Sequence, residues 1–456
     1  MENKINGNSP KSLNRTLTLF PLVFIGLSYM IPTAVFSPYG ITAVITEGRV
    51  PAAYLMALIM ISFTAYSYGK MIKVFPSAGS AYTYTQQTIS PHFGFLVGWV
   101  VMMDYLFLPM LNVLASSIFL HAAFSFIPVW IWILAFTIPI TITNLFGIQL
   151  NAKINTILII FQVTFVVIFI GLSIQQIITQ NIGAGTIFFM EPFHNSDLSF
   201  LPILTGASIV ATSFLGFDAV TTFSEETVNP KKTVPKAIFL VALFGGTIFI
   251  LVSYTLNLVY PDFTSFINPD VAGFEIVQSL GFTLLTSFFI AASAVGCIGG
   301  TLSAQASGAR LLYAMGRDSV LPSKIFGKLH SKYKTPVFNI LFIGLVCLGA
   351  FFIDLGIGFS LVNFGALFAF TFVNLSVIFH FYIKQKQRGI KGTILYLMIP
   401  LIGACLTSWI WLSLSKNALI FGGIWSFIGI VYLLILTKGF VKKPPQYHID
   451  EKEISQ

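Results

Sequence analysis

One carboxylate lies inside a long apolar stretch and close to a glycine: Asp218 ends the segment Ser-Phe-Leu-Gly-Phe-Asp, which begins at Ser213. A charged side chain at the centre of a lipid bilayer costs at least about 2.5 kcal/mol, so it is retained where it is paired or faces a cavity. Gly216 and Ser213 have low helix propensity, which allows the backbone to open and offer its polar groups to a ligand. We therefore expect Asp218 to bind a cation, with a purely structural role as the alternative.

A second carboxylate, Asp104, lies in another apolar stretch and precedes Tyr105. A diamine carries two ammonium groups, and two separated carboxylates would suit it. The ring faces of Tyr105, Phe214 and Phe217 would add cation–π attraction of about 0.5–2 kcal/mol each. We expect these residues to contribute to substrate binding. A structural hydrogen bond between two helices is the alternative role for Asp104.

The composition indicates a membrane protein, because 56% of the residues are hydrophobic and 9% are charged. Soluble domains carry about 25% charged residues. Apolar runs of about 18 or more residues recur along nearly the whole chain, and each is long enough to cross about 30 Å of hydrocarbon. We expect an all-α polytopic membrane protein with about twelve transmembrane helices. They are predicted near residues 17–46, 51–74, 93–121, 126–147, 152–175, 200–224, 235–260, 280–313, 336–354, 357–383, 393–413 and 417–438.

The net charge of +9 indicates membrane topology and does not favour nucleic acid binding. When the predicted loops are assigned to alternate sides, Arg49 and Lys416 are the basic residues on one side, and the other Lys and Arg residues lie on the opposite side. Positively charged loops stay in the cytoplasm. We therefore expect both termini, a tail at residues 1–16 and a tail at residues 439–456, to be cytoplasmic.

Two of the predicted spans are interrupted at corresponding positions. The first contains Pro32 and Pro38 in mid-membrane, where proline removes a backbone donor and clashes with the preceding turn. The sixth is interrupted at Gly216. Since spans one and six lie five apart, the pattern is typical of inverted-repeat transporters, which bind substrate between the broken helices. A kink without function is the alternative for each proline taken alone. Further candidate substrate-binding residues at these breaks are Thr33, Ala34 and Ser213.

These features resemble the amino acid–polyamine–organocation superfamily of transporters, and the resemblance covers the predicted ten-helix core. It rests on residues 75–84, 94–99, 214–218, 224–227, 229–230, 235–238, 307–310 and 315–318. Similarity to bacterial putrescine importers within that superfamily rests on residues 50–54, 104–110, 216–226 and 363–367. The resemblance implies a LeuT-like 5+5 inverted repeat with broken helices 1 and 6, uptake across a bacterial plasma or inner membrane, and proton symport. It also implies a transport core at 17–383 followed by helices 11 and 12 at 384–438.

The first break bears on the class of substrate. Amino acid carriers of this superfamily usually have a glycine-rich break there, whose free amides hold the substrate carboxylate. This chain has no glycine in the stretch of Pro32, Thr33 and Ala34, and proline has no amide donor. The expected substrate is therefore a small organic cation, putrescine or a related polyamine. An amino acid permease or exchanger on the same fold is the alternative.

Energy coupling depends on which group binds the coupling ion. Many amino acid carriers of the superfamily have a lysine in span five, where this chain has Gln162. A carboxylate such as Asp218 or Glu225 would then have to bind the proton, and sodium is the alternative ion. Glu225 and Glu226 lie where span six meets the cytoplasm. We expect them either to handle protons or gate the cytoplasmic side, or to form solvated ion pairs with Lys231, Lys232 and Lys236.

Other function classes lack the residues that they need. The six histidines are scattered, and no pair of the three cysteines has metal-ligand spacing. No glycine-rich loop ending in Lys-Ser or Lys-Thr is present to bind a nucleotide. No filter loop of a channel is evident. We therefore expect no catalytic residues, no metal, no cofactor and no enzymatic activity, and we expect the partners to be the substrate, the coupling ion and the lipid bilayer.

Overall fold

The computed structural model describes residues 15–193 and 199–445. Most of the two predicted tails, residues 1–14 and 446–456, therefore lies outside the described residues. The described residues form helices and connecting loops, and they contain no β-strand beyond an isolated parallel bridge between Leu17 and Thr227. The expectation of an all-α chain is confirmed.

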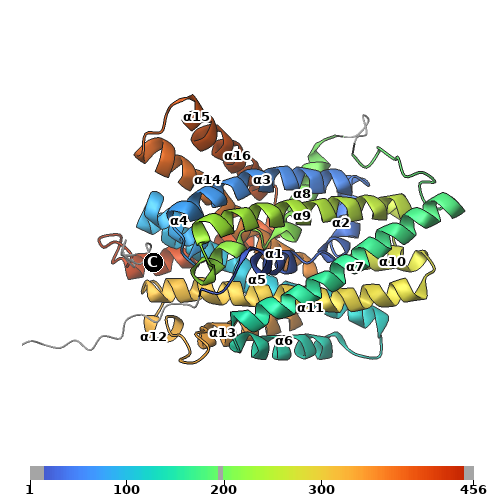
Figure 1. The fold of residues 1–456 in the computed structure, drawn as a ribbon, viewed down its shortest axis with the longest axis horizontal. Coiled ribbons are helices and arrows are strands. Elements are labelled where there is room, and N and C mark those ends of the chain that lie inside the picture. Colours follow the sequence, from blue (N-terminus) through green and yellow to red (C-terminus); the bar gives the residue numbers. More distant parts are fainter. Residues whose placement is uncertain (1–14, 194–198, 446–456) are drawn as a thin grey trace, which may run out of the picture.

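The helices are arranged as one bundle (Figure 1). The α-helices are α1 (Leu19–Met30), α2 (Tyr39–Thr46), α3 (Val50–Val74), α4 (Ser80–Thr88), α5 (Pro91–Ala123), α6 (Val129–Leu145), α7 (Ile148–Gln180), α8 (Leu201–Val210), α9 (Pro230–Val259), α10 (Ala272–Ser279), α11 (Thr283–Arg317), α12 (Ser323–Phe326), α13 (Val337–Cys347), α14 (Leu355–Val377), α15 (Ile390–Thr393), α16 (Ile399–Leu412) and α17 (Lys416–Leu436). The short 3-10 segments are η1 (Ala34–Phe36), η2 (Ala211–Phe214), η3 (Ala219–Glu226), η4 (Phe263–Ser265), η5 (Pro269–Val271) and η6 (Leu348–Phe351), and the π-helical segments are η7 (Ile378–Lys384) and η8 (Ile394–Met398).

Ten helical stretches of the described chain are long and apolar enough to cross a membrane. The protein is therefore a multi-pass membrane protein. Two further predicted spans correspond to apolar helices that are shorter, α6 and the continuous pair α13 and η6 (Val337–Phe351). Of the twelve spans predicted from the sequence, ten are therefore helices of full membrane-spanning length in the described chain, and two are shorter apolar helices.

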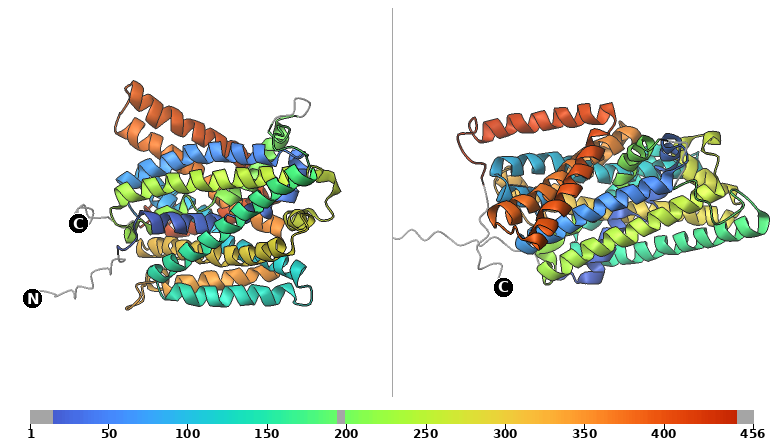
Figure 2. Two further views of the ribbon diagram at one scale, coloured as in Figure 1. Left: turned by 45° about the vertical axis from the view of Figure 1, so that its right-hand side comes forward. Right: turned by 90° about the horizontal axis from the view of Figure 1, so that it is seen from above.

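The position of each helix in the bundle follows from how much of its apolar surface other helices cover. Within the most apolar 18-residue stretch of α5, 83% is buried inside the molecule. This helix packs against α4, α11 and α14. In α17 the corresponding fraction is 17%, so most of its apolar surface faces outward. Figure 2 shows α17 along one edge of the bundle. The residues of α5 are therefore at the centre of the molecule, whereas α17 is peripheral.

The first predicted span is broken, as expected. α1 ends at Met30, and Ile31 then adopts a left-handed backbone conformation with φ of 52°. Pro32 follows, and the chain resumes a regular helix in α2 only after Pro38. Because proline cannot donate to a preceding carbonyl, the segment of residues 31–38 leaves backbone groups outside the helical pattern. This break places side chains of residues 31–38 in the interior of the bundle.

The sixth predicted span is broken as well. α8 continues into η2, which ends at Phe214; Leu215 is extended, and Gly216 has φ of +124°, which L-residues rarely adopt. η3 then begins with Asp218 as its N-cap residue. A Cβ atom at Gly216 would lie 2.8 Å from Tyr29 Cβ and 3.0 Å from the carbonyl oxygen of Gly26. Glycine is therefore required both by the turn and by the close approach of α1, and the second break lies against the last two turns of α1, just before the first break.

Candidate functional site

The site is built around Asp218, which the second break turns into the interior. The side chain is 1% exposed. Its Oδ2 accepts a hydrogen bond from the Tyr105 hydroxyl at 3.2 Å, and its Oδ1 accepts one from the Gly216 amide at 3.3 Å. Because Gly216 is non-helical, its amide is free to point at the carboxylate. The break thus both exposes the donor and orients the acid.

Asp104 lies on α5, one residue before Tyr105, and is also 1% exposed. Its Oδ1 has no hydrogen-bond partner among the described residues. α14 approaches this position closely, because a Cβ atom at Gly365 would lie 2.9 Å from the Asp104 amide nitrogen. The packing of α14 on α5 therefore keeps solvent from the acid on that side.

The two acids form one electrostatic unit. The charge of Asp218 acts on Asp104, and both charges act on the hydroxyls of Tyr29 and Tyr105. No Lys, Arg or His within residues 15–193 and 199–445 lies at salt-bridge distance from either carboxylate. A buried charge without a partner is costly, so a site with two carboxylates and no cation of its own is complementary to a cationic ligand.

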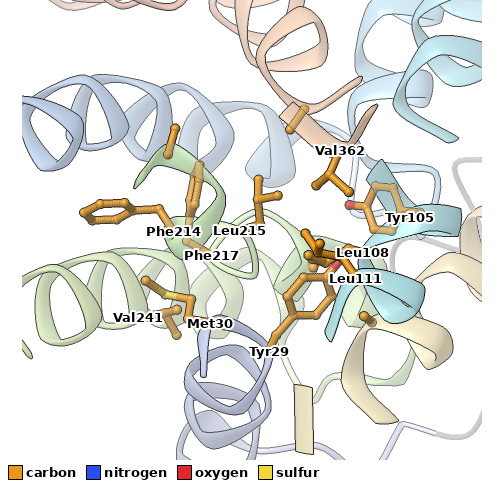
Figure 3. Packing of buried hydrophobic residues seen from close by; sticks show 14 of the residues in the cluster. Tyr29, Met30, Tyr105, Leu108, Leu111, Phe214, Leu215, Phe217, Val241 and Val362 are labelled. Atoms are coloured by element: carbon orange, nitrogen blue, oxygen red, sulfur yellow. The ribbon is translucent and has the colours of Figure 1, made fainter. Parts of the chain in front are cut away.

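A cavity adjoins these acids. It lies between the first break, the C-terminal half of α5 and the end of η2, and it encloses about 620 Å³, including space open to solvent at its mouth. Small-molecule sites typically measure about 300–1,000 Å³. Three of the residues predicted from the sequence line it, namely Thr33, Ala34 and Ser213. Figure 3 shows Tyr29 of α1 beside Leu108 and Leu111 of α5, all of which line the same cavity.

The other predicted site residues lie outside that lining. Asp104, Tyr105 and Asp218 are not among its lining residues, and Asp218 lies at the start of η3. Phe214 and Phe217 are fully buried, and Figure 3 shows both beside Leu215. The Phe214 ring centroid lies 5.4 Å from that of Phe249, and the Phe217 centroid lies 5.2 Å from that of Phe370. Both phenylalanines thus form an apolar wall behind the break that holds Asp218.

The cavity also contains polar residues that the sequence reasoning missed. The polar lining residues that were not predicted from the sequence are Tyr29, Ser37, Asn112, Ser116, Thr212 and Ser293. Tyr29 is in the last turn of α1 before a proline-induced break, and a polar residue at such a helix end is a signal that sequence reasoning can use. Asn112 and Ser293 lie on uninterrupted helices, and no local pattern distinguishes them from packing residues.

Two ion pairs join η3 to the C-terminal part of α11. Along α11, Ser293 lines the cavity, a Cβ atom at Gly308 would lie 2.8 Å from the Tyr105 carbonyl oxygen, and the two arginines follow Gly308, so the pairs lie beyond the acids as seen from the cavity. Glu226 accepts hydrogen bonds from Arg310 at 2.6 and 2.9 Å, with both side chains buried. Glu225 accepts bonds from Arg317 at 3.1 and 3.2 Å and from the Ala78 amide at 3.0 Å. The alternative expectation, that the two glutamates form solvated ion pairs with Lys231, Lys232 and Lys236, is wrong, because both glutamates pair with arginines of α11. Arg310 lies within a predicted span, and a buried arginine requires a carboxylate nearby, so this signal was available in the sequence.

These ion pairs and one neighbouring hydrogen bond connect three helical elements. η3 carries the glutamates, α11 ends at Arg317, and α4 contributes Tyr82, whose hydroxyl donates to Asp318 Oδ2 at 2.7 Å. Burial raises the pKa of Asp318 to about 6, although Tyr82 and Arg317 act in the opposite direction. Thr222 and Ser307 add a hydroxyl contact of 2.8 Å between η3 and α11. Ionic and polar contacts therefore join η3, α11 and α4.

Gln162 on α7 is buried, and the Thr33 hydroxyl donates to its Oε1 at 3.4 Å. The position named from the superfamily resemblance thus contacts the first break through a neutral amide. No group of three His, Cys, Asp or Glu residues suited to a metal ion occurs in the described part of the chain.

Comparisons with known proteins agree in describing transporters. The family model for amino acid permeases matches residues 21–437. The low-affinity putrescine importer PlaP of Escherichia coli strain K12 is 41% identical over 449 residues, covering 98% of this chain and 99% of the importer. The methylthioribose transporter of Bacillus subtilis is 28% identical and covers 94% of this chain and 95% of its own length. A branched-chain amino acid permease, BcaP of Bacillus subtilis, is 28% identical, with 86% of each chain covered.

Proposed function

The chain belongs to the amino acid permease family, and we propose that it imports a small organic cation, putrescine or a related polyamine, by secondary active transport. The observation that carries this proposal is the buried pair Asp104 and Asp218, to which the described chain offers no cationic partner. The 41% identity to a putrescine importer over nearly the full length of both chains supports the same class of substrate.

The proposed architecture has twelve transmembrane helices, with the first ten in two inverted repeats of five. The two broken spans lie five apart and meet at Gly216, which supports this arrangement. Residues 17–383 would form the transport core, and residues 384–438 would form helices 11 and 12. Both termini would be cytoplasmic in a bacterial plasma or inner membrane, with Arg49 and Lys416 on the outer side.

Within this architecture the two carboxylates bind ammonium. Tyr105 orients Asp218 through its hydroxyl bond. A hydrogen bond from ammonium to a carboxylate contributes about 1.5–3 kcal/mol, more than one to a neutral acceptor. The apolar wall behind the break excludes water and strengthens this attraction. The substrate-binding residues proposed are Asp218, Asp104, Tyr105, Thr33, Ala34, Ser213, Phe214 and Phe217.

Glu225 and Glu226 are proposed to gate the cytoplasmic side. Their pairs with Arg317 and Arg310 tie η3 to α11 on the side of the acids away from the cavity. Breaking these pairs would release η3 and open that side to water. The cavity on one side and the ion pairs on the other support a conformation that faces outward.

The proposed energy source is the proton gradient, used by proton symport. Gln162 provides no fixed charge, and the site is rich in carboxylates that can bind a proton. Purified protein in proteoliposomes should accumulate labelled putrescine when the outside is more acidic than the inside. Accumulation should persist when choline replaces sodium, and a protonophore should abolish it. Uptake that follows the sodium gradient and ignores the pH gradient would contradict proton symport.

An amino acid permease or exchanger is the second candidate, since relatives at 28% identity include branched-chain amino acid permeases. Competition against labelled putrescine distinguishes the two. Spermidine should compete more strongly than ornithine or leucine if the acid pair selects the substrate. If leucine competes best, or if the protein takes up no putrescine, the permease is favoured and the importer proposal is refuted.

A further inference from the structure

The cavity beside the acid pair has a chemistry different from that of the acids. Every described residue that lines it is uncharged. Its polar side chains are hydroxyls and one amide, and they come from α1, the first break, α5, η2 and α11. A ligand group that enters this space meets hydrogen-bonding partners without meeting a carboxylate.

Some of these polar groups are unsatisfied. The Tyr29 hydroxyl, the Ser37 hydroxyl and the Asn112 amide nitrogen have no hydrogen-bond partner among the described residues. Tyr29 and Ser37 are more than nine-tenths buried. Leaving a buried polar group without a partner costs about 1–3 kcal/mol. Groups of this kind therefore point to a ligand that forms hydrogen bonds in the cavity.

The cavity and the acids are close enough to hold two ends of one molecule. Leu108 lines the cavity and lies four residues after Asp104 on α5, a rise of about 6 Å along the helix. Tyr29 also lines the cavity, and the charges of both acids act on its hydroxyl. A short aliphatic chain bound to the acids at one end would therefore place its other end in the cavity.

We propose that this cavity is a neutral subsite, which binds the far end of the substrate by hydrogen bonds while the acid pair binds a single ammonium group. This inference rests on the proposed function and refines its substrate class. The ligands it selects are short primary amines whose opposite end carries a hydrogen-bonding group, either a second ammonium or a hydroxyl. Asn112, Ser37 and Tyr29 determine this selectivity.

Three compounds of equal chain length test the chemistry of the subsite. Inhibition of labelled putrescine uptake into proteoliposomes is measured for putrescine, 4-amino-1-butanol and butylamine. The amino alcohol should inhibit within about threefold of putrescine, and butylamine should be about tenfold weaker, because it leaves the cavity's polar groups without partners. If the amino alcohol is as weak as butylamine, a carboxylate holds the second ammonium and the inference is overturned. Equal inhibition by all three compounds also overturns it.

A gain of charge tests the position of the subsite. Asn112→Asp introduces a carboxylate there, and the ratio of putrescine to 4-amino-1-butanol affinity should rise about tenfold, the effect of a charge-assisted bond. An unchanged ratio in a variant that still transports would show that Asn112 does not face the ligand.

A pair of serine variants separates recognition from folding. Ser37→Ala should weaken putrescine and 4-amino-1-butanol about fivefold and leave butylamine unchanged. Ser173 on α7 is the matched control, because its buried hydroxyl also lacks a partner among the described residues but does not line the cavity. Ser173→Ala should leave all three ligands unchanged. If Ser37→Ala weakens all three equally, its role is structural and the inference fails. If the unmodified protein transports no putrescine, the proposed function itself fails, which is a different outcome from a wrong ligand ratio.

Discussion

Removing the carboxylate of Glu226 leaves the guanidinium of Arg310 buried without its counter-ion. The two side chains are 5% and 4% exposed, and two hydrogen bonds of 2.9 Å or less join them. Breaking a buried pair by removing one partner costs about 3–5 kcal/mol, because the remaining charge is uncompensated. We therefore expect Glu226→Leu to lower the free energy of unfolding by about this amount.

The double variant isolates the pair from other effects. Arg310→Met combined with Glu226→Leu removes both charges, so the unfolding free energy should recover most of the loss seen in either single variant. Denaturant titration of the detergent-solubilised protein, followed by tryptophan fluorescence, measures each variant.

Glu225→Leu is the matched control. Its pair with Arg317 is more accessible, with side chains 21% and 17% exposed, so the charge left on Arg317 keeps more contact with water and the loss should be smaller than for Glu226→Leu. If Glu225→Leu and Glu226→Leu lower the free energy of unfolding equally, burial does not make Glu226–Arg310 the more costly of the two ion pairs to break. A double variant no more stable than the weaker single variant would refute the reasoning from an uncompensated charge.

Three further predictions concern single residues. Asp218→Asn should weaken putrescine binding about 10- to 150-fold in a competition assay, since it removes a charge-assisted bond of about 1.5–3 kcal/mol; the exposed Asp270→Asn is its control, and near-normal affinity would exclude Asp218 from the site. Gly216→Ala should lower thermal stability and uptake, because Gly216 has a positive φ and the added Cβ atom would lie 2.8 Å from Tyr29 Cβ, whereas Gly171→Ala, whose added Cβ atom would meet no atom within 4 Å, should be tolerated; equal effects would contradict the argument from close packing. Burial raises the pKa of Asp318 from 3.8 to about 6, so its contribution to stability is greatest below pH 3.8 and is lost as the pH rises to about 6; Asp318→Asn should remove this part of the pH dependence, and identical stability profiles for the two proteins would disprove it.

Much of the architecture follows from local sequence patterns. Apolar runs long enough to cross a bilayer indicated the membrane helices, and ten of them are present at full length. Proline at positions 32 and 38 and glycine at 216 predicted both breaks, since backbone conformations at these residues depend mainly on their own covalent structure. Asp104 and Asp218 stand out in the sequence because a carboxylate in an apolar segment is costly wherever the chain places it, and both are buried in the structure.

The tertiary structure alone determined which of these groups meet. Tyr105 and Asp218 are 113 positions apart in the chain, yet the hydroxyl of one donates to the other. Glu226 pairs with Arg310, 84 positions away, in preference to the lysines that follow it in sequence. The cavity combines residues from the first break with Asn112 and Ser293, which carry no local signal. Helical periodicity and residue chemistry act over a few residues, whereas pairing and cavity shape depend on how distant helices pack. The sequence by itself therefore determined the helices, their breaks and their intramembrane acids, and packing decided the partners of those acids and the uncharged chemistry of the space beside them.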